Sequence, residues 1–141
     1  MPSFRRSFIA ACLTVASLFA VGVAALAEDL DVTIYESGGD GQMAECWLGI
    51  VKGLDPKGDG FLAVRSGPGG KYRKIDEVHN GDHVMVYDER GKWLGVIYGP
   101  GDSIIQKDVL GCGFIGKGKR PVPYPGKKGW IHSKWVDILA G

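Results

Sequence analysis

From residue 46 onward the chain alternates between short apolar runs and clusters of turn-forming residues. The runs are four to six residues long and rich in valine, isoleucine and aromatic side chains, which is typical of β-strands. No segment sustains the 3.6-residue apolar period of an amphipathic helix. The pattern therefore predicts an all-β domain. The expected strands cover residues 46–51, 62–65, 83–87, 93–98, 129–131 and 136–139.

Glycine, proline and asparagine mark the reversals between these strands. Residues 66–70, Ser-Gly-Pro-Gly-Gly, cannot continue a strand or a helix, because glycine permits positive φ and proline lacks an amide donor. Residues 71–78 predict either one or two helical turns or, in better agreement with their surroundings, a loop leading into a short strand. Residues 83–98 predict a β-hairpin with a four-residue connection at 88–91. Residues 132–135 predict a single helical turn.

Four motifs resemble the bacterial SH3 (SH3b) domain family in sequence and in order. They are Leu-Ala-Val-Arg-Ser-Gly-Pro at 62–68, Asn-Gly-Asp at 80–82, Gly-Lys-Trp-Leu-Gly-Val at 91–96, and Gly-Trp-Ile at 129–131 followed by Trp-Val at 135–136.

The resemblance covers residues 60–139 and implies a small SH3-like barrel of about five strands. Residues 99–128, rich in glycine and proline, form a long insertion before the last strands. A loop of this length inside a compact domain is commonly functional or an insertion. The chain departs from the family at Ala63, where asparagine is common, and in the length of the insertion.

The first 27 residues are expected to be a secretory signal peptide. Arg5 and Arg6 precede the uncharged stretch 7–27, and Ala-Leu-Ala at 25–27 has the small-x-small form of a cleavage site. The alternative is an uncleaved anchor, since about 20 uncharged residues can span a bilayer. Cleavage after Ala27 makes the protein periplasmic or secreted, with a membrane contact only if the signal is retained.

The remaining chain divides into an acidic lead-in, residues 28–43, and the SH3-like domain, residues 44–141. The lead-in is expected to be flexible or loosely attached, with one short candidate strand at 32–35. Without residues 1–27 the chain has 15 basic and 16 acidic residues, a balance that argues against nucleic-acid binding. Residues 28–45 hold six acids and no base, whereas 117–134 hold six bases and no acid. These are either solvated surfaces or, for the basic segment, a contact with an anionic polymer or partner.

Two cysteines, Cys46 and Cys112, remain after the signal peptide, which contains Cys12. In an exported protein an even pair most often forms a disulfide. Closing a loop of about 67 residues stabilises the fold by about 4 kcal/mol on the chain-entropy estimate.

No pattern indicates catalysis, a metal or a cofactor, so we expect a non-enzyme that needs none of them. Asn80-Gly81 separates His79 from His83 and breaks any helix that could align them as metal ligands. The acidic turn at 55–66 lacks two of the acids of a calcium loop, and 67–72 fails the spacing of a phosphate loop. A catalytic cysteine would require Cys46 and Cys112 to be free thiols.

Aromatic and basic side chains interleave along the domain, and two interpretations stay open. The tryptophans can be core residues and the tyrosines scattered surface residues, or together they can line a shallow groove beside the 66–74 loop that stacks on peptide or glycan. The groove would be formed by Arg65, Tyr72, Arg73, Trp93, Tyr98, Tyr124 and Trp130.

The expected function is that of an exported, non-catalytic SH3b binding module. Its partner would be cell-wall peptide or glycan, or an envelope protein. The alternative is a protein-interaction or immunity-type inhibitor that acts on an exported partner through the 99–128 loop.

Overall fold

The computed structural model of the chain describes residues 29–38, 46–106, 114 and 116–140. In this part, seven antiparallel strands form one sheet in the order β4-β3-β8-β6-β5-β2-β9, and β1 pairs with β7 in a separate sheet. The elements are β1 (Tyr35–Gly38), β2 (Trp47–Val51), β3 (Leu62–Arg65), β4 (Lys74–Val78), β5 (His83–Arg90), β6 (Trp93–Tyr98), α1 (Ser103–Gln106), β7 (Gly118–Pro121), β8 (Lys128–His132), the 3₁₀ turn η1 (Ser133–Trp135) and β9 (Val136–Ala140).

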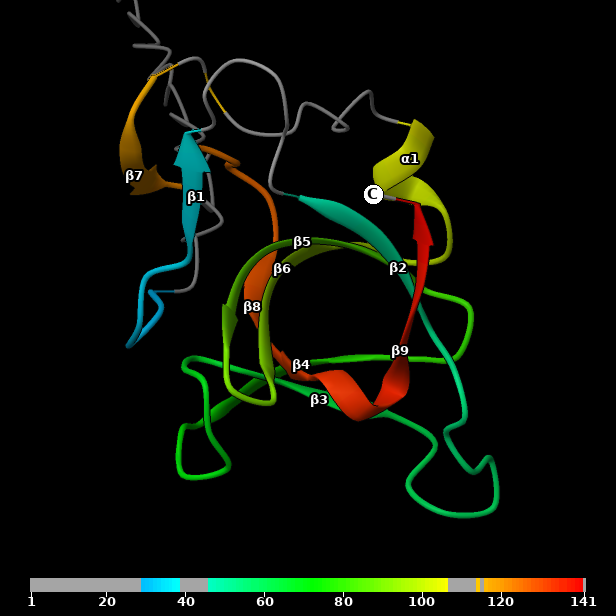
Figure 1. The fold of residues 1–141 in the computed structure, drawn as a ribbon. Helices are drawn as coiled ribbons and strands as arrows, with labels where there is room; N and C mark the ends of the chain where they lie inside the picture. Colours follow the sequence, from blue (N-terminus) through cyan, green and yellow to red (C-terminus); the bar gives the residue numbers. More distant parts are fainter. Residues whose placement is uncertain (1–28, 39–45, 107–113, 115, 141) are drawn as a thin grey trace, which may run out of the picture.

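The seven-stranded sheet curves around an apolar core, and the small sheet lies outside it (Figure 1). Side chains alternate between the two faces of a strand, and in β5 and β6 the core receives Val84, Val86, Leu94 and Val96. This architecture confirms the predicted all-β, SH3-like barrel. The barrel sheet has seven strands instead of about five, and the lead-in and the insertion supply two further strands, β1 and β7.

The outer face of β5, β6 and β8 is buried as well. It presents Met85, Ile97 and Trp130, and these side chains pack in a second cluster with Ile34 from the lead-in and Ile104 from α1. A sheet covered on both faces carries apolar residues in near-continuous runs, as β6 does. The two apolar layers therefore share the middle strands of the barrel.

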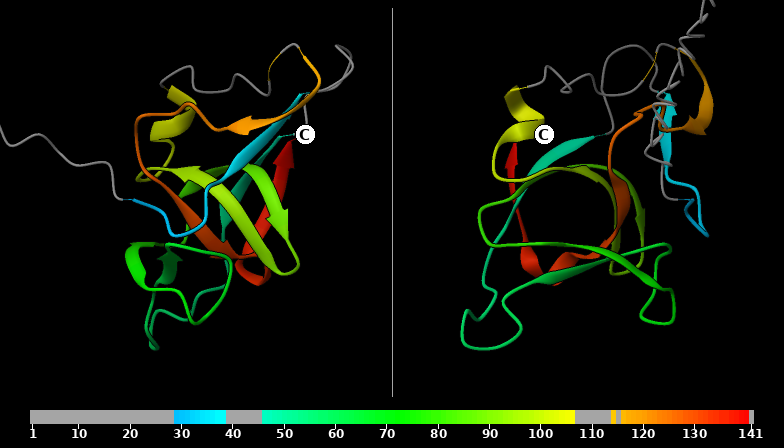
Figure 2. Two further views of the ribbon diagram at one scale, coloured as in Figure 1. Left: turned by 90° about the vertical axis from the view of Figure 1, so that its left-hand side faces the viewer. Right: turned by 180° about the vertical axis from the view of Figure 1, so that it is seen from behind.

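Residues 29–38 lie against the barrel, which differs from the expected flexible lead-in. Ile34 is only 2% exposed and Glu36 is buried. The apolar residues Val32 and Ile34 are two positions apart, so an extended chain directs both toward the same neighbour. Figure 2 shows this segment running along the side of the barrel. The strand itself starts at Tyr35, later than expected.

The β5–β6 hairpin is confirmed, although its connection is shorter than four residues. Asp88, Glu89 and Arg90 continue the ladder with β6, and a register shift lies between Val86 and Asp88. The chain reverses at Gly91, whose φ is 62°, a left-handed conformation that favours glycine.

The closing strand, helical turn and last strand are confirmed as β8, η1 and β9. His132 precedes the turn, and its Nδ1 accepts a hydrogen bond from the Lys134 N–H at 3.1 Å. Residues 74–78 form a strand, β4, so the helical alternative for this segment is wrong. β9 pairs with β2, which places β2 between β5 and β9.

Within the described ranges, no helix is long and apolar enough to cross a membrane. The predicted signal peptide, residues 1–27, lies outside the described residues and stays a prediction.

Candidate ligand-binding surface

The loop that follows β3 folds back on itself, and three of the predicted binding residues hold it in place. The Arg65 guanidinium donates a hydrogen bond to the Tyr72 carbonyl oxygen at 2.9 Å, and the Ser66 N–H donates to the Arg73 carbonyl oxygen at 3.0 Å. The Tyr72 ring lies over Gly67, where an added Cβ would be 2.5 Å from a ring carbon. Gly67 therefore leaves the space that the Tyr72 ring needs to cover the turn.

Residues 29–32 of the lead-in bind this loop through their main chain and one carboxylate. The Ser66 hydroxyl donates to Asp31 Oδ2 at 2.5 Å, and Arg73 Nε lies 3.5 Å from the same oxygen. The Val32 N–H donates to the Ser66 carbonyl oxygen at 3.1 Å, and the Trp130 indole N–H donates to the Val32 carbonyl oxygen at 2.9 Å. The barrel thus holds an extended chain segment at this edge by both its carboxylate and its peptide groups.

The seven predicted groove residues do not form a single surface. Arg65, Tyr72 and Arg73 lie together on the 65–73 loop, and Trp130 lies next to them on β8, where it pairs in register with Arg65. Tyr98 lies elsewhere, in the inner core of the barrel.

Trp130 is 0% exposed, so it cannot stack on a ligand in this conformation. The indole ring is large and apolar with one donor, and it satisfies that donor while it is buried. Tyr98 is buried too, and its hydroxyl donates to Asp76 Oδ2 at 3.0 Å. The interpretation of the tryptophans as core residues is therefore correct for Trp130.

Trp93 and Tyr124 are half-buried at the margin of the outer apolar cluster. Trp93 meets His132 edge to face, with ring centroids 5.4 Å apart. These two aromatic residues belong to the packing between barrel and insertion rather than to the 65–73 loop.

Ser66 and Asp31 were not among the predicted site residues, although their contact defines this edge. A signal for them is present in the sequence, because the acidic lead-in is complementary to the basic residues of the 65–73 loop. Opposite charge alone does not give the register of an extended segment, which is set by the main-chain bonds of Val32.

Asp76 organises a second polar cluster at the rim of the barrel. It accepts hydrogen bonds from Tyr98, from Lys127 Nζ at 2.8 Å and from the Glu77 N–H at 2.8 Å. Burial on its own raises the pKa of Asp76, but these hydrogen bonds and the charge of Lys127 outweigh burial and lower that pKa below its usual value. The carboxylate stays ionised at neutral pH and joins β4 and β6 to the end of the insertion, which is a structural role.

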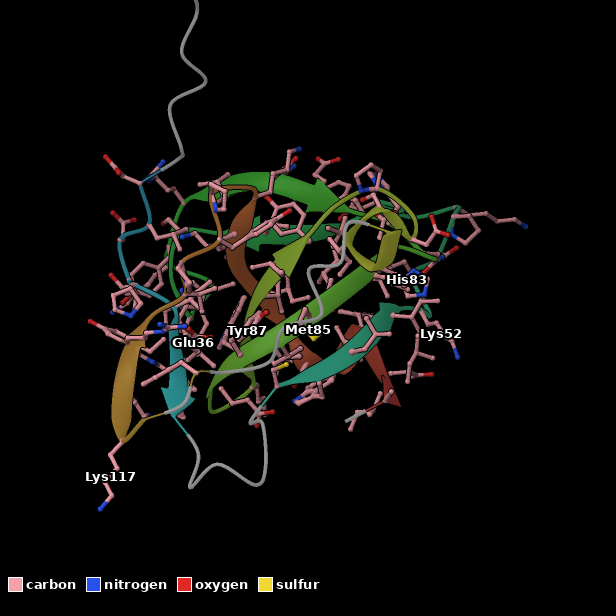
Figure 3. The ribbon with its side chains drawn as sticks, turned by 90° about the horizontal axis from the view of Figure 1, so that it is seen from above. Glu36, Lys52, His83, Met85, Tyr87 and Lys117 are labelled. Carbon is pink, nitrogen blue, oxygen red and sulfur yellow. The ribbon has the colours of Figure 1, made fainter. Side chains whose placement is uncertain are left out.

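Three of the six basic residues between 117 and 134 form side-chain hydrogen bonds or ion pairs within the chain, and Lys134 lies over the Trp135 ring. Arg120 pairs with Glu36, Lys127 with Asp76, and Lys128 donates to the Val122 carbonyl oxygen. Lys117 and Lys119 are exposed, and the side chains of these two lysines form no hydrogen bond or ion pair with another described residue. Figure 3 shows Lys117 pointing away from the body of the protein, whereas Glu36 and Tyr87 lie near each other.

Cys46 is buried in the outer cluster, with its sulfur 3.5 Å from that of Met85. Its predicted partner, Cys112, lies outside the described residues, so the disulfide stays a prediction.

The described residues contain no group of three or more histidine, cysteine, aspartate or glutamate side chains that could hold a metal ion. In the same part of the chain, the 65–73 loop offers hydrogen-bond donors, the Arg73 guanidinium and the Tyr72 ring. This chemistry suits recognition of an extended, carboxylate-bearing chain.

Neither a curated protein nor a solved structure matches the chain. Residues 60–137, more than half of the 141 residues, match the family described as bacterial SH3 domain. The match begins just before β3 and runs into β9, so it contains the 65–73 loop, the β5–β6 hairpin and the closing turn. The chain therefore belongs to the bacterial SH3 domain family.

Proposed function

We propose that the protein is an exported, non-catalytic binding module that recognises the peptide or glycan of the bacterial cell wall. Membership of the bacterial SH3 family indicates a binding module in general. The uncharged stretch 7–27 with its Ala-Leu-Ala end supports export.

One observation carries the choice of ligand. The 65–73 loop and Trp130 already hold an extended segment by a carboxylate, a peptide N–H and a peptide carbonyl. The peptide stems of a cell wall are short, extended and rich in carboxylates, so they present the same groups. Arg73 and Lys71, both exposed, supply positive charge at the lip of the loop.

Cosedimentation with purified peptidoglycan sacculi tests this proposal. The chain from residue 28 to residue 141 is incubated with sacculi at several salt concentrations, and the bound fraction is measured after centrifugation. We expect binding that weakens with salt, because exposed charges contribute to it.

Two variants with the same change of charge locate the surface. Lys71→Ala removes a cation that lies 5.5 Å from the centre of the Tyr72 ring, and it should lower the affinity by about two- to fivefold. Lys57→Ala removes a cation from a distant exposed turn and should leave the affinity unchanged. Complete recovery of the protein in the supernatant at every salt concentration would exclude the wall as the ligand.

A second candidate function, interaction with an exported protein through the insertion, is favoured by the exposure of β7. All four residues of this strand are exposed, and among the described strands β7 pairs with β1 alone. Lys119 on β7 and Lys117 just before it offer charge to an acidic partner. An exported protein that copurifies with the chain, and is lost from the double variant Lys117→Ala, Lys119→Ala but not from Lys57→Ala, would support this function. Equal copurification with all variants would argue against it.

A further inference from the structure

The lead-in has two parts that differ in how they are held. Residues 29–32, which we call the strap, are tied to the loop by polar contacts, and their apolar side chains Leu30 and Val32 are only partly buried against the outer cluster. The Asp31 and Arg73 side chains are 50% and 54% exposed. Residues 34–38, which we call the anchor, contain the buried Ile34 and Glu36 and the strand β1. Exposed ion pairs are weak, whereas buried apolar side chains resist removal. The strap can therefore open while the anchor stays in place.

Opening the strap would uncover a small set of polar groups that need new partners. They are the Trp130 indole N–H, the Ser66 carbonyl oxygen, the Ser66 hydroxyl and the Arg73 guanidinium, which also donates to the Asp29 carbonyl oxygen of the strap. Among the described residues, no buried side-chain polar atom is without a hydrogen-bond partner. An incoming ligand must supply a carboxylate, a peptide N–H and a peptide carbonyl in the order in which the strap supplies them.

We propose that this edge is a binding site for an extended, acidic peptide, and that the strap is its intramolecular occupant, which a ligand in trans must displace. The ligand has a carboxylate side chain immediately before the residue whose N–H and carbonyl are bound, as Asp31 precedes Val32. The site is then closed in the free protein and opens only to a ligand of the same chemistry. The identity of the natural ligand rests on the proposed function, whereas the site itself does not.

Competition with the strap sets the affinity of any ligand. A tethered segment acts at an effective concentration in the millimolar range, so an isolated peptide of the same sequence competes poorly with it. The apparent affinity is the intrinsic affinity multiplied by the small fraction of molecules in which the strap is open. A substitution that weakens only the strap should therefore strengthen binding in trans.

A fluorescent peptide with the sequence Asp-Leu-Asp-Val-Thr, blocked at both ends, provides the probe. Its binding to the 28–141 chain is measured by fluorescence anisotropy for the wild type, for Asp31→Ala and for the control Asp59→Ala. Asp59 is exposed in a turn distant from the loop and carries the same charge. We expect Asp31→Ala to bind the peptide about tenfold more tightly than the wild type does, and Asp59→Ala to match the wild type.

The peptide itself supplies the reciprocal control. Alanine in place of its second aspartate should weaken binding to Asp31→Ala by about tenfold, because Ser66 and Arg73 lose their carboxylate. Equal affinity of the wild type and Asp31→Ala for the peptide, or binding that does not depend on that aspartate, would overturn the proposal. Absence of binding to either protein at millimolar peptide would also overturn it.

Hydrogen exchange on the wild type tests displacement of the strap without a substitution, so the result does not depend on whether a variant folds. Addition of the peptide should accelerate exchange of the Val32 amide and leave the anchor amide of Tyr35, which donates to Asp88 Oδ2, protected. Unchanged exchange at Val32 in saturating peptide would count against displacement.

A parallel sacculus assay separates this inference from the proposed function. Binding of the peptide without binding of sacculi to Asp31→Ala would refute the wall ligand alone. Equal binding of sacculi to the wild type and Asp31→Ala, without binding of the peptide, would refute the strap alone.

Discussion

Replacing Ile34 by alanine should destabilise the protein by about 2–3 kcal/mol, because this side chain belongs to the outer apolar cluster. Ile34 is 2% exposed, and it lies so close to Gly95 that an added Cβ there would be 2.9 Å from its Cγ2. A flexible lead-in would instead make the substitution nearly neutral. The experiment therefore decides whether the anchor is part of the folded unit.

The magnitude follows from the atoms removed. The change deletes three carbons, each worth about 0.8 kcal/mol of apolar transfer, and the remaining cavity adds to that loss. The anchor lies at the surface of the cluster and can relax toward the cavity, which keeps the total near the lower end of the range for buried isoleucine.

Urea unfolding followed by tryptophan fluorescence measures the effect, and thermal unfolding should show a melting temperature lower by about 10 °C. Ile138→Ala is the matched control, since Ile138 is 70% exposed on β9 and its replacement should change stability by less than about 1 kcal/mol. If the two variants unfold at the same urea concentration, the assignment of Ile34 to the core is wrong.

Three further substitutions test the packing and charges around the outer cluster. Gly95→Ala should destabilise the protein by about 1–2 kcal/mol, because its Cβ would collide with Ile34; urea unfolding measures the loss. Arg120→Ala should lower the stability of the protein by about 1–2 kcal/mol, because the buried Glu36 carboxylate loses the guanidinium that pairs with it. A double-mutant cycle should show a smaller loss in a Glu36→Gln background. Burial, together with the charge of Glu36, raises the pKa of Tyr87 above its usual value of 10.0. The folded protein holds the Tyr87 proton more tightly than the unfolded chain does. The contribution of this proton to the free energy of unfolding is therefore complete below pH 10 and is lost as pH rises through the raised pKa. Tyr87→Phe should flatten the decline of the urea midpoint above pH 10.

The barrel could be predicted from the sequence because its signals are local. Short, near-continuous apolar runs in β5 and β6, a turn at Gly91 and the Gly-Trp-Ile strand each specify one element and its neighbour. The order of these elements then identifies the SH3-like fold. The second apolar layer has no such signal, since Ile34, Ile104 and Val122 come from three separate segments.

The candidate site was harder to predict for the same physical reason. Arg65, Tyr72 and Arg73 were predicted together because they lie on one loop. Composition made the lead-in resemble a disordered tail, but a short extended segment needs only a few buried side chains and main-chain bonds to be held. Trp130 was expected at a groove, but the segment that covers it lies 98 positions away in the sequence.

Because of β2, the segment that matches the family is shorter than the segment that folds as one unit. β2 pairs with both β5 and β9, yet it precedes the first residue of the family match. A fragment of residues 60–137 would lack β2, so the edges of β5 and β9 would be unpaired. The apolar outer face of the sheet would also be open to water. Such edges invite pairing between molecules. The shortest piece suited to expression, crystallisation or grafting onto another protein is therefore the stretch from the strap to the end of β9, rather than the homologous segment.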